Sequence, residues 1–236
     1  MQRRILIVPL VVAMVAVVFL EFAATRSGTY EVVRSTKIEA PAPVVFAQLA
    51  DFKAWTAWSP WEGKDPQMKK TYDGPAGAVG SSYAWQGDEK VGEGKMSITE
   101  ITPPKTLKLR LEFIKPFAAV ATTTFDVAPA GDNAVTAKWT MTGTNSFMSK
   151  LFGMVKSMDA MIGGDFDKGL ASLKEVSETE AKKQADEAAA EKAKADEAAA
   201  EKAKADEAAK AAEAAPKGKG KGKGKGAKAK GKKKKH

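Results

Sequence analysis

Apolar and polar residues alternate with a period of two along three stretches in the middle of the chain, a pattern typical of half-buried strands. The apolar rows are Leu107, Leu109, Leu111 and Phe113; Ala119, Ala121, Thr123, Phe125 and Val127; and Val135, Ala137, Trp139 and Met141. Weaker alternation covers residues 30–40, 68–73, 81–86 and 91–101. The pattern therefore predicts six to seven strands.

Short turn sequences separate these stretches. They lie at residues 102–105 (TPPK), at Lys115-Pro116 and at residues 129–133 (PAGDN), and their proline, glycine, aspartate and asparagine residues favour turns. Strands joined by short turns pair as an antiparallel meander with one apolar face. That face has to be covered by another layer.

A long amphipathic helix near the C-terminal end is predicted to supply this layer. Its apolar positions recur every three or four residues, at Phe147, Leu151, Met154, Val155, Met158, Ile162, Phe166, Leu170, Leu173 and Val176. Asn145 and Ser146 supply N-cap chemistry for a helix that begins near Phe147. Gly163, Gly164 and Gly169 are interpreted as points of close approach to the sheet or of a bend. A shorter helix is predicted from Pro43 through Leu49.

Four groups of residues form a set of motifs: 38–46 (IEAPAPVVF), 51–55 (DFKAW) with 58–61 (WSPW), 91–96 (VGEGKM) and 111–117 (LEFIKPF). Together these motifs resemble the polyketide cyclase/dehydrase and lipid transport family of the START-like (SRPBCC) superfamily. The resemblance covers roughly residues 30–176. It implies an α+β helix-grip fold, in which a curved antiparallel sheet wraps around the long helix and leaves a hydrophobic cavity between the two layers. It does not specify a substrate, because one fold hosts many functions.

We expect the cavity to be lined by apolar residues of the strands, the tryptophan-rich segment and the long helix. The candidate lining residues are Trp55, Trp58, Trp85, Met96, Leu109, Leu111, Phe113, Phe125, Trp139, Met141, Met154, Met158, Met161 and Ile162. Methionine is flexible and polarisable, so it adapts to varied apolar shapes. The alternative is that these side chains simply fill the core.

The aromatic residues Phe52, Trp55, Trp58 and Trp61 have two interpretations. They gate the cavity mouth, or they anchor an irregular segment onto the sheet. We favour the anchoring role, because tryptophan buries a large area.

The residue types present exclude several kinds of catalytic site. The chain has no cysteine and its single histidine is His236, so thiolate nucleophiles, histidine triads and multi-histidine metal sites are excluded. Met96 follows the Gly92–Lys95 segment where a P-loop requires Ser or Thr. Glu93 and Glu100 are the candidates for a carboxylate inside the cavity, and Asp165 and Asp167 are expected to be solvated. No cofactor, metal or catalytic residue is predicted.

The N-terminal segment has the pattern of a membrane anchor. Arg3 and Arg4 precede an apolar run over residues 5–24, which is interrupted by Pro9 and Glu21 and would span roughly 30 Å as a helix. A cleaved signal peptide is the alternative, although the run is longer than usual and lacks a clear cleavage site. The arginines favour a cytoplasmic N-terminus, with the domain on the extracytoplasmic (periplasmic) side.

The formal net charge of +9 is concentrated in the tail. Eleven lysines lie within residues 217–235, and subtracting them leaves −2 for the rest of the chain. They are Lys217, Lys219, Lys221, Lys223, Lys225, Lys228, Lys230, Lys232, Lys233, Lys234 and Lys235. With glycine between them they are predicted to be disordered and to bind polyanions, namely anionic lipid, wall polymer or nucleic acid. A spacer without a partner is the alternative.

Before this tail the unit ADEAAAEKAK occurs at residues 185–194 and 195–204, followed by a degenerate copy. It predicts a solvated helix that continues the last helix of the domain, whereas a stable coiled coil is disfavoured because no apolar side chain exceeds alanine.

The predicted organisation is an anchor at 1–27, a helix-grip domain at 28–178, a charged Ala-rich helix at 179–215 and a Lys/Gly tail at 216–236. Three hypotheses for function follow. The first is non-catalytic binding or transport of a hydrophobic small molecule or lipid near a membrane. The alternatives are a cyclase/aromatase-like enzyme and a tether between a membrane and a polyanion.

Overall fold

The computed structural model describes Met14, residues 28–144 and residues 157–214. Residues up to Ala185 belong to one compact unit and residues from Asp186 to a second. The predicted anchor (except Met14), the predicted N-cap at residues 145–146 and the lysine-rich tail all lie outside the described residues. Among the residues described, no helix has both the length and the apolar character to cross a bilayer.

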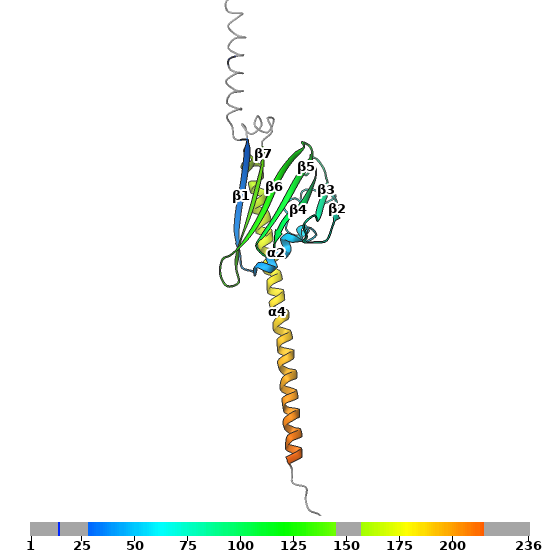
Figure 1. Cartoon of the computed structure of the whole chain (residues 1–236), viewed down its shortest axis with the longest axis vertical. Helices are drawn as coiled ribbons and strands as arrows, with labels where there is room; N and C mark the ends of the chain where they lie inside the picture. The colour runs from blue at the N-terminus through cyan, green and yellow to red at the C-terminus, as the bar shows by residue number, and fades with distance from the viewer. Residues whose placement is uncertain (1–13, 15–27, 145–156, 215–236) are drawn as a thin grey trace, which may run out of the picture. The chain divides into compact units, whose positions relative to one another are not determined.

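Seven antiparallel strands form a single sheet in the order β1-β7-β6-β5-β4-β3-β2 (Figure 1). Their bounds are β1 Thr29–Ile38, β2 Lys69–Asp73, β3 Ser82–Gln86, β4 Glu93–Thr102, β5 Thr106–Lys115, β6 Ala119–Pro129 and β7 Val135–Thr144. All seven stretches with alternating residues form strands. The alternation predicted them because one face of such a strand is buried and the other is exposed to solvent. The α+β fold class is confirmed.

Two short helices connect β1 to β2. Helix α2 spans Ala42–Ala50 and buries Val44, Val45, Phe46 and Leu49. The 3₁₀ helix η1 spans Ala54–Ala57 and buries Trp55. The predicted short helix at Pro43 is therefore confirmed, with proline in the first turn, where its missing N–H costs no hydrogen bond.

The long helix α4 spans Met158–Ala214, and its first turns lie against one face of the sheet (Figure 1). Its start differs from the predicted start near Phe147. The backbone N–H of Ala160 donates to Oγ of Ser157, and the backbone N–H of Met161 donates to the carbonyl oxygen of Ser157. Ser157 is therefore the N-cap of α4. The apolar spacing continues upstream of this cap, so spacing alone did not locate it.

The core lies between α4, the α2–η1 segment and the inner face of the sheet. Register aligns the inner residues in rows across the strands, such as Leu107, Phe125 and Trp139, or Ile98, Leu109, Thr123 and Met141. Phe166, Leu170 and Leu173 of α4 are buried against this face. The outer face carries ion pairs, including Arg110 with Glu112, as the alternation predicted.

The described part of the second unit is helical from Asp186 to the end of α4. Its side chains are exposed from Asp186 through Ala208, and Lys192 pairs with Asp196 at 2.7 Å. A helix without a buried face depends on the propensity of Ala, Glu and Lys and on such (i, i+4) pairs.

Candidate functional site

The sheet and α4 are in direct contact at one part of their interface. Trp139 of β7 stacks on Phe166 of α4 with ring centroids 4.0 Å apart and planes at 12°. Gly169 allows this approach, because a Cβ at that position would lie 2.9 Å from both the Trp139 ring and Pro60. No room for a ligand remains between the layers at this point.

The tryptophan-rich segment reinforces the same region. Trp55 and Trp58 are buried, and their indole N–H groups donate to the carbonyl oxygens of Leu49 at 2.9 Å and Gln48 at 3.1 Å. Both rings meet Phe125 edge-on, at 5.7 and 6.0 Å between centroids. These contacts support the anchoring role: Trp55, Trp58 and Phe125 fill the core rather than border a space.

A different part of the inner face keeps residual exposure. Trp85, Met96 and Leu111 are each 9% exposed, whereas Leu109, one row further along the sheet, is fully buried. Met96 lies opposite Leu111, Leu111 opposite Ala121, and Ala121 opposite Gly143. With Met141, Phe113 and Tyr83 these residues form a continuous apolar surface across β3–β7, which we call the wall.

The wall is rich in aromatic rings near the β2 edge of the sheet. Tyr83 stacks between Tyr72 and Trp85, with centroids 5.3 and 5.9 Å away, and Phe113 meets Trp85 edge-on at 6.3 Å. Burial raises the pKa of Tyr83, and the negative charge of Glu62 raises it further. The Trp85 indole donates to the carbonyl of Val91 at 3.1 Å. The Tyr83 phenol is therefore neutral at physiological pH.

One polar group in the closed region is unusual. The indole Nε1 of Trp139 is buried and has no hydrogen-bond partner among the described residues. An unsatisfied buried donor costs about 1–3 kcal/mol. Thr123, in the neighbouring row, is also buried and places a hydroxyl on the same inner face. The Trp139 N–H is sealed inside the core, at the point where the stack on Phe166 leaves no room for a ligand.

Arg34 fixes the first turns of α4 against the sheet. Its guanidinium donates to Asp159 at 2.7 Å and to Asp167 at 3.2 Å. The hydrogen bond with Arg34 lowers the pKa of Asp159 below its ordinary value, and the two aspartates raise the pKa of Arg34. The two ion pairs hold the first turns of α4, from which Met158 and Ile162 pack against the core.

Most of the predicted lining residues lie on the inner side of the domain, but they separate into two groups. Trp55, Trp58, Leu109, Phe125 and Trp139 belong to the closed region, and Trp85, Met96, Leu111, Phe113 and Met141 belong to the wall. Met154 lies outside the described residues. Met161 was expected to face inward, but its side chain is 58% exposed. It is five residues from Phe166, which places it about 140° around the helix from the buried line.

The carboxylates proposed for the cavity face outward. Glu93 pairs with Lys115 at 2.6 Å, and Glu100 pairs with Lys108 at 2.8 Å. Strict alternation from Ile98 would have turned the Glu100 side chain inward. The pairing register with β5 shifts between these two residues, so the Glu100 side chain points outward instead. Asp165 was expected to be solvated, yet it pairs with Lys64 at 2.6 Å and its side chain is mostly buried.

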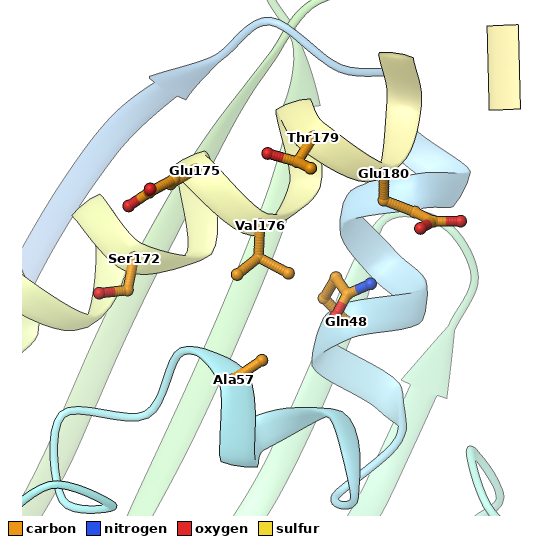
Figure 2. A pocket seen from close by; sticks show the side chains of 7 residues that line it. All are labelled: Gln48, Ala57, Ser172, Glu175, Val176, Thr179 and Glu180. Atoms are coloured by element: carbon orange, nitrogen blue, oxygen red, sulfur yellow. The ribbon is translucent and has the colours of Figure 1, made fainter. Parts of the chain in front are cut away.

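A surface groove that sequence reasoning missed lies between α4, α2 and η1. It has a volume of about 400 Å³ and is lined by Gln48, Ala57, Ser172, Glu175, Val176, Thr179 and Glu180. Figure 2 shows Val176 of α4 and Ala57 of η1 directed into the space between the three helices. The groove is open and lined by both polar and apolar groups, and it includes none of the predicted lining residues. Only the packing of the three helices creates it, so no local pattern signals it.

A family model described as "Polyketide cyclase / dehydrase and lipid transport" matches residues 29–178. No curated protein matches the chain.

The solved structures that are similar to this chain are distant in sequence. A solution structure of a protein from Thermobifida fusca is 24% identical, with a TM-score of 0.48, and the match covers 62% of this chain and 92% of that one. Protein CV1439 from Chromobacterium violaceum is 14% identical, with a TM-score of 0.44 and coverage of 64% and 97%. Ginseng major latex-like protein 151 from Panax ginseng is 16% identical, with a TM-score of 0.43 and coverage of 66% and 99%.

Proposed function

The chain belongs to the polyketide cyclase / dehydrase and lipid transport family, and from this premise we propose that its domain binds one apolar small molecule or lipid against the wall. Binding is non-catalytic in this proposal. The ligand is held between the inner face of β3–β7 and the first turns of α4.

The observation that carries the proposal is the contrast between the two parts of the inner face. The closed region is sealed by the stacking of Trp139 on Phe166, whereas Trp85, Met96 and Leu111 of the wall keep 9% exposure each. Apolar surface that the protein's own core leaves partly accessible gains free energy when a ligand covers it, at about 25 cal/mol per Å². Met96 and Met141 adapt to ligands of different shape.

The domain acts at a membrane in this proposal, tethered by the predicted anchor and facing the extracytoplasmic side. The support is the apolar run at residues 5–24 behind two arginines. The lysine-rich tail stays a predicted contact for polyanions.

A binding role is favoured over catalysis because of where the carboxylates lie. Glu93 and Glu100, the two candidates for chemistry inside the domain, form ion pairs on the outer face. General acid–base catalysis requires a titratable group within hydrogen-bond reach of the reacting atom. Neither glutamate meets that requirement for a ligand on the wall.

A matched pair of substitutions on β6 tests the proposal. Ala121 is buried in the wall, and the adjacent Thr122 is exposed on the opposite face. Ala121→Leu adds the volume of several methylene groups to the ligand space, whereas Thr122→Leu places the same side chain outside. The full chain and both variants would be purified in mild detergent, extracted with organic solvent and analysed by mass spectrometry.

The proposal predicts an apolar species in the extracts of the native chain and of Thr122→Leu, with much less in that of Ala121→Leu. The melting temperature of ligand-depleted Ala121→Leu should stay close to that of the ligand-depleted native chain. If the space were already filled by protein, the added leucine would cost about 1–3 kcal/mol of stability. Destabilised Ala121→Leu together with empty extracts from all three proteins would refute the proposal.

A further inference from the structure

The hairpin between β5 and β6 exposes a cluster of large apolar side chains. Phe117 is 77% exposed, Ile114 57% and Val120 45%. The three residues lie within a stretch of seven positions, in a turn region that is normally polar in a soluble protein. We call residues 114–120 the hairpin tip. Grouped exposed apolar side chains on a small domain mark a contact surface.

The strand register places this tip at the end of the sheet where the domain begins. The connecting pairs are Thr29 with Thr144, Gly143 with Ala121, and Ala119 with Phe113. Across these pairs, the first residue of β1 lies at the same end of the sheet as the hairpin tip, and β1 is two strands away from β6. The 27 residues that precede Gly28, with their apolar run, therefore join the domain at this end.

From these observations we propose that the hairpin tip docks into the interface of a lipid bilayer, next to the predicted anchor. The occupant is the boundary between headgroups and acyl chains, where aromatic and branched apolar side chains enter by roughly 5–10 Å. Lys115 lies within the tip and pairs with Glu93 at 2.6 Å, and its long side chain, 66% exposed, can cover apolar surface while its ammonium stays in water. The tip is also braced, because the β3–β4 turn at Gly92 packs against the backbone carbonyl of Lys115.

Docking would fix the orientation of the domain. An anchor followed by a short connection lets a domain tumble above the surface, whereas a second contact point holds one end of the sheet against the lipid. The wall residues Trp85 and Phe113 lie toward this end, since Gly94 pairs with both. The inference concerns the surface alone and does not depend on whether the wall binds a ligand.

Cysteine scanning suits the test, because the chain has no cysteine and one introduced thiol gives one labelled site. Phe117→Cys reports on the tip. Val79→Cys is the matched control: it is also an exposed apolar residue, at 62%, but it precedes β3 at the end of that strand that points away from the hairpin tip, near Ile98 of β4. Each full-length variant would carry an environment-sensitive NBD fluorophore and be reconstituted in vesicles of phosphatidylethanolamine and phosphatidylglycerol. Some lipids would carry a nitroxide quencher near the glycerol end of the acyl chain.

The expected result is blue-shifted emission at position 117 with several-fold stronger quenching than at position 79. Flotation of the vesicles reports separately on the anchor. Flotation with equal, weak quenching at both positions would overturn the tip inference and leave the anchor standing, and failure to float would overturn both. A third outcome would be blue-shifted emission at position 117 that the nitroxide lipids do not quench and that increases with protein density. That result would identify a second copy of the chain as the occupant, and it would also overturn the inference. Loss of ligand in the extraction experiment would leave all these outcomes unchanged.

Discussion

Gly164 and Gly169 lie five residues apart on α4, and replacing each with alanine probes the contact between helix and sheet. A Cβ at Gly164 would have no heavy atom within 4 Å. A Cβ at Gly169 would lie 2.9 Å from the Trp139 ring and 2.9 Å from Pro60. Both neighbours are rigid rings, so neither can move away as the end of a flexible side chain would.

The magnitudes follow from this geometry. Alanine stabilises a helix interior by about 1 kcal/mol relative to glycine, so Gly164→Ala should raise stability by about that amount. Gly169→Ala gains the same propensity but overpacks the core, which costs about 1–3 kcal/mol. Because the propensity gain is common to both, the two variants should differ by about 1–3 kcal/mol. At roughly 2–4 °C per kcal/mol for a chain of this size, the gap in melting temperature is at least about 2 °C.

Tryptophan fluorescence during thermal and urea unfolding is the appropriate assay. All five tryptophans lie between Trp55 and Trp139, so the signal reports on the domain and not on the charged helix or the tail. Urea slopes should match among the native chain and both variants, since none changes the surface exposed on unfolding. If Gly169→Ala stabilised the domain as much as Gly164→Ala, then α4 would not pack on Trp139 as described and the closed region would not exist.

One further prediction concerns the ion pair between Arg34 of β1 and Asp159 of α4. Arg34 lowers the pKa of Asp159 below 3.8, so the pair stabilises the fold above that pH and the contribution disappears as the pH falls through and below it. Urea unfolding should therefore show Asp159→Asn less stable than the native chain at neutral pH, with a deficit that shrinks as the pH falls below 3.8. Asp132→Asn, on the exposed β6–β7 turn, should be as stable as the native chain at neutral pH. A deficit of Asp159→Asn that did not shrink in acid would mean that packing, not charge, accounts for it.

The strands were predictable because each has one buried face and one solvent-exposed face. Leu107, Leu109 and Leu111 alternate with Lys108 and Arg110, and this pattern alone fixes which side is buried. The same logic failed for Glu100, because a register shift between strands leaves no mark in the alternation of a single strand.

The start of α4 and the division of its inner surface were less accessible to sequence reasoning. The apolar spacing runs through Met154 to Met158, while the cap is Ser157, a signal that was present but outweighed by the periodicity. The wall and the closed region have the same composition, since Met96 and Leu111 resemble Leu109 in kind. Their difference arises from where the Trp139–Phe166 stack and Gly169 bring the layers together, which depends on three-dimensional packing.

Methyl NMR of methionine would locate the ligand most directly. The full chain, labelled with ¹³C at the methionine methyl groups, would be compared before and after ligand removal, with assignments from Met96→Leu, Met141→Leu and Met161→Leu. We predict that the signals of Met96 and Met141, both on the wall, shift on removal and return when the extract is added back. The exposed Met161 should not respond. Signals from Met96 and Met141 that stay fixed throughout would contradict the claim that the wall holds a ligand.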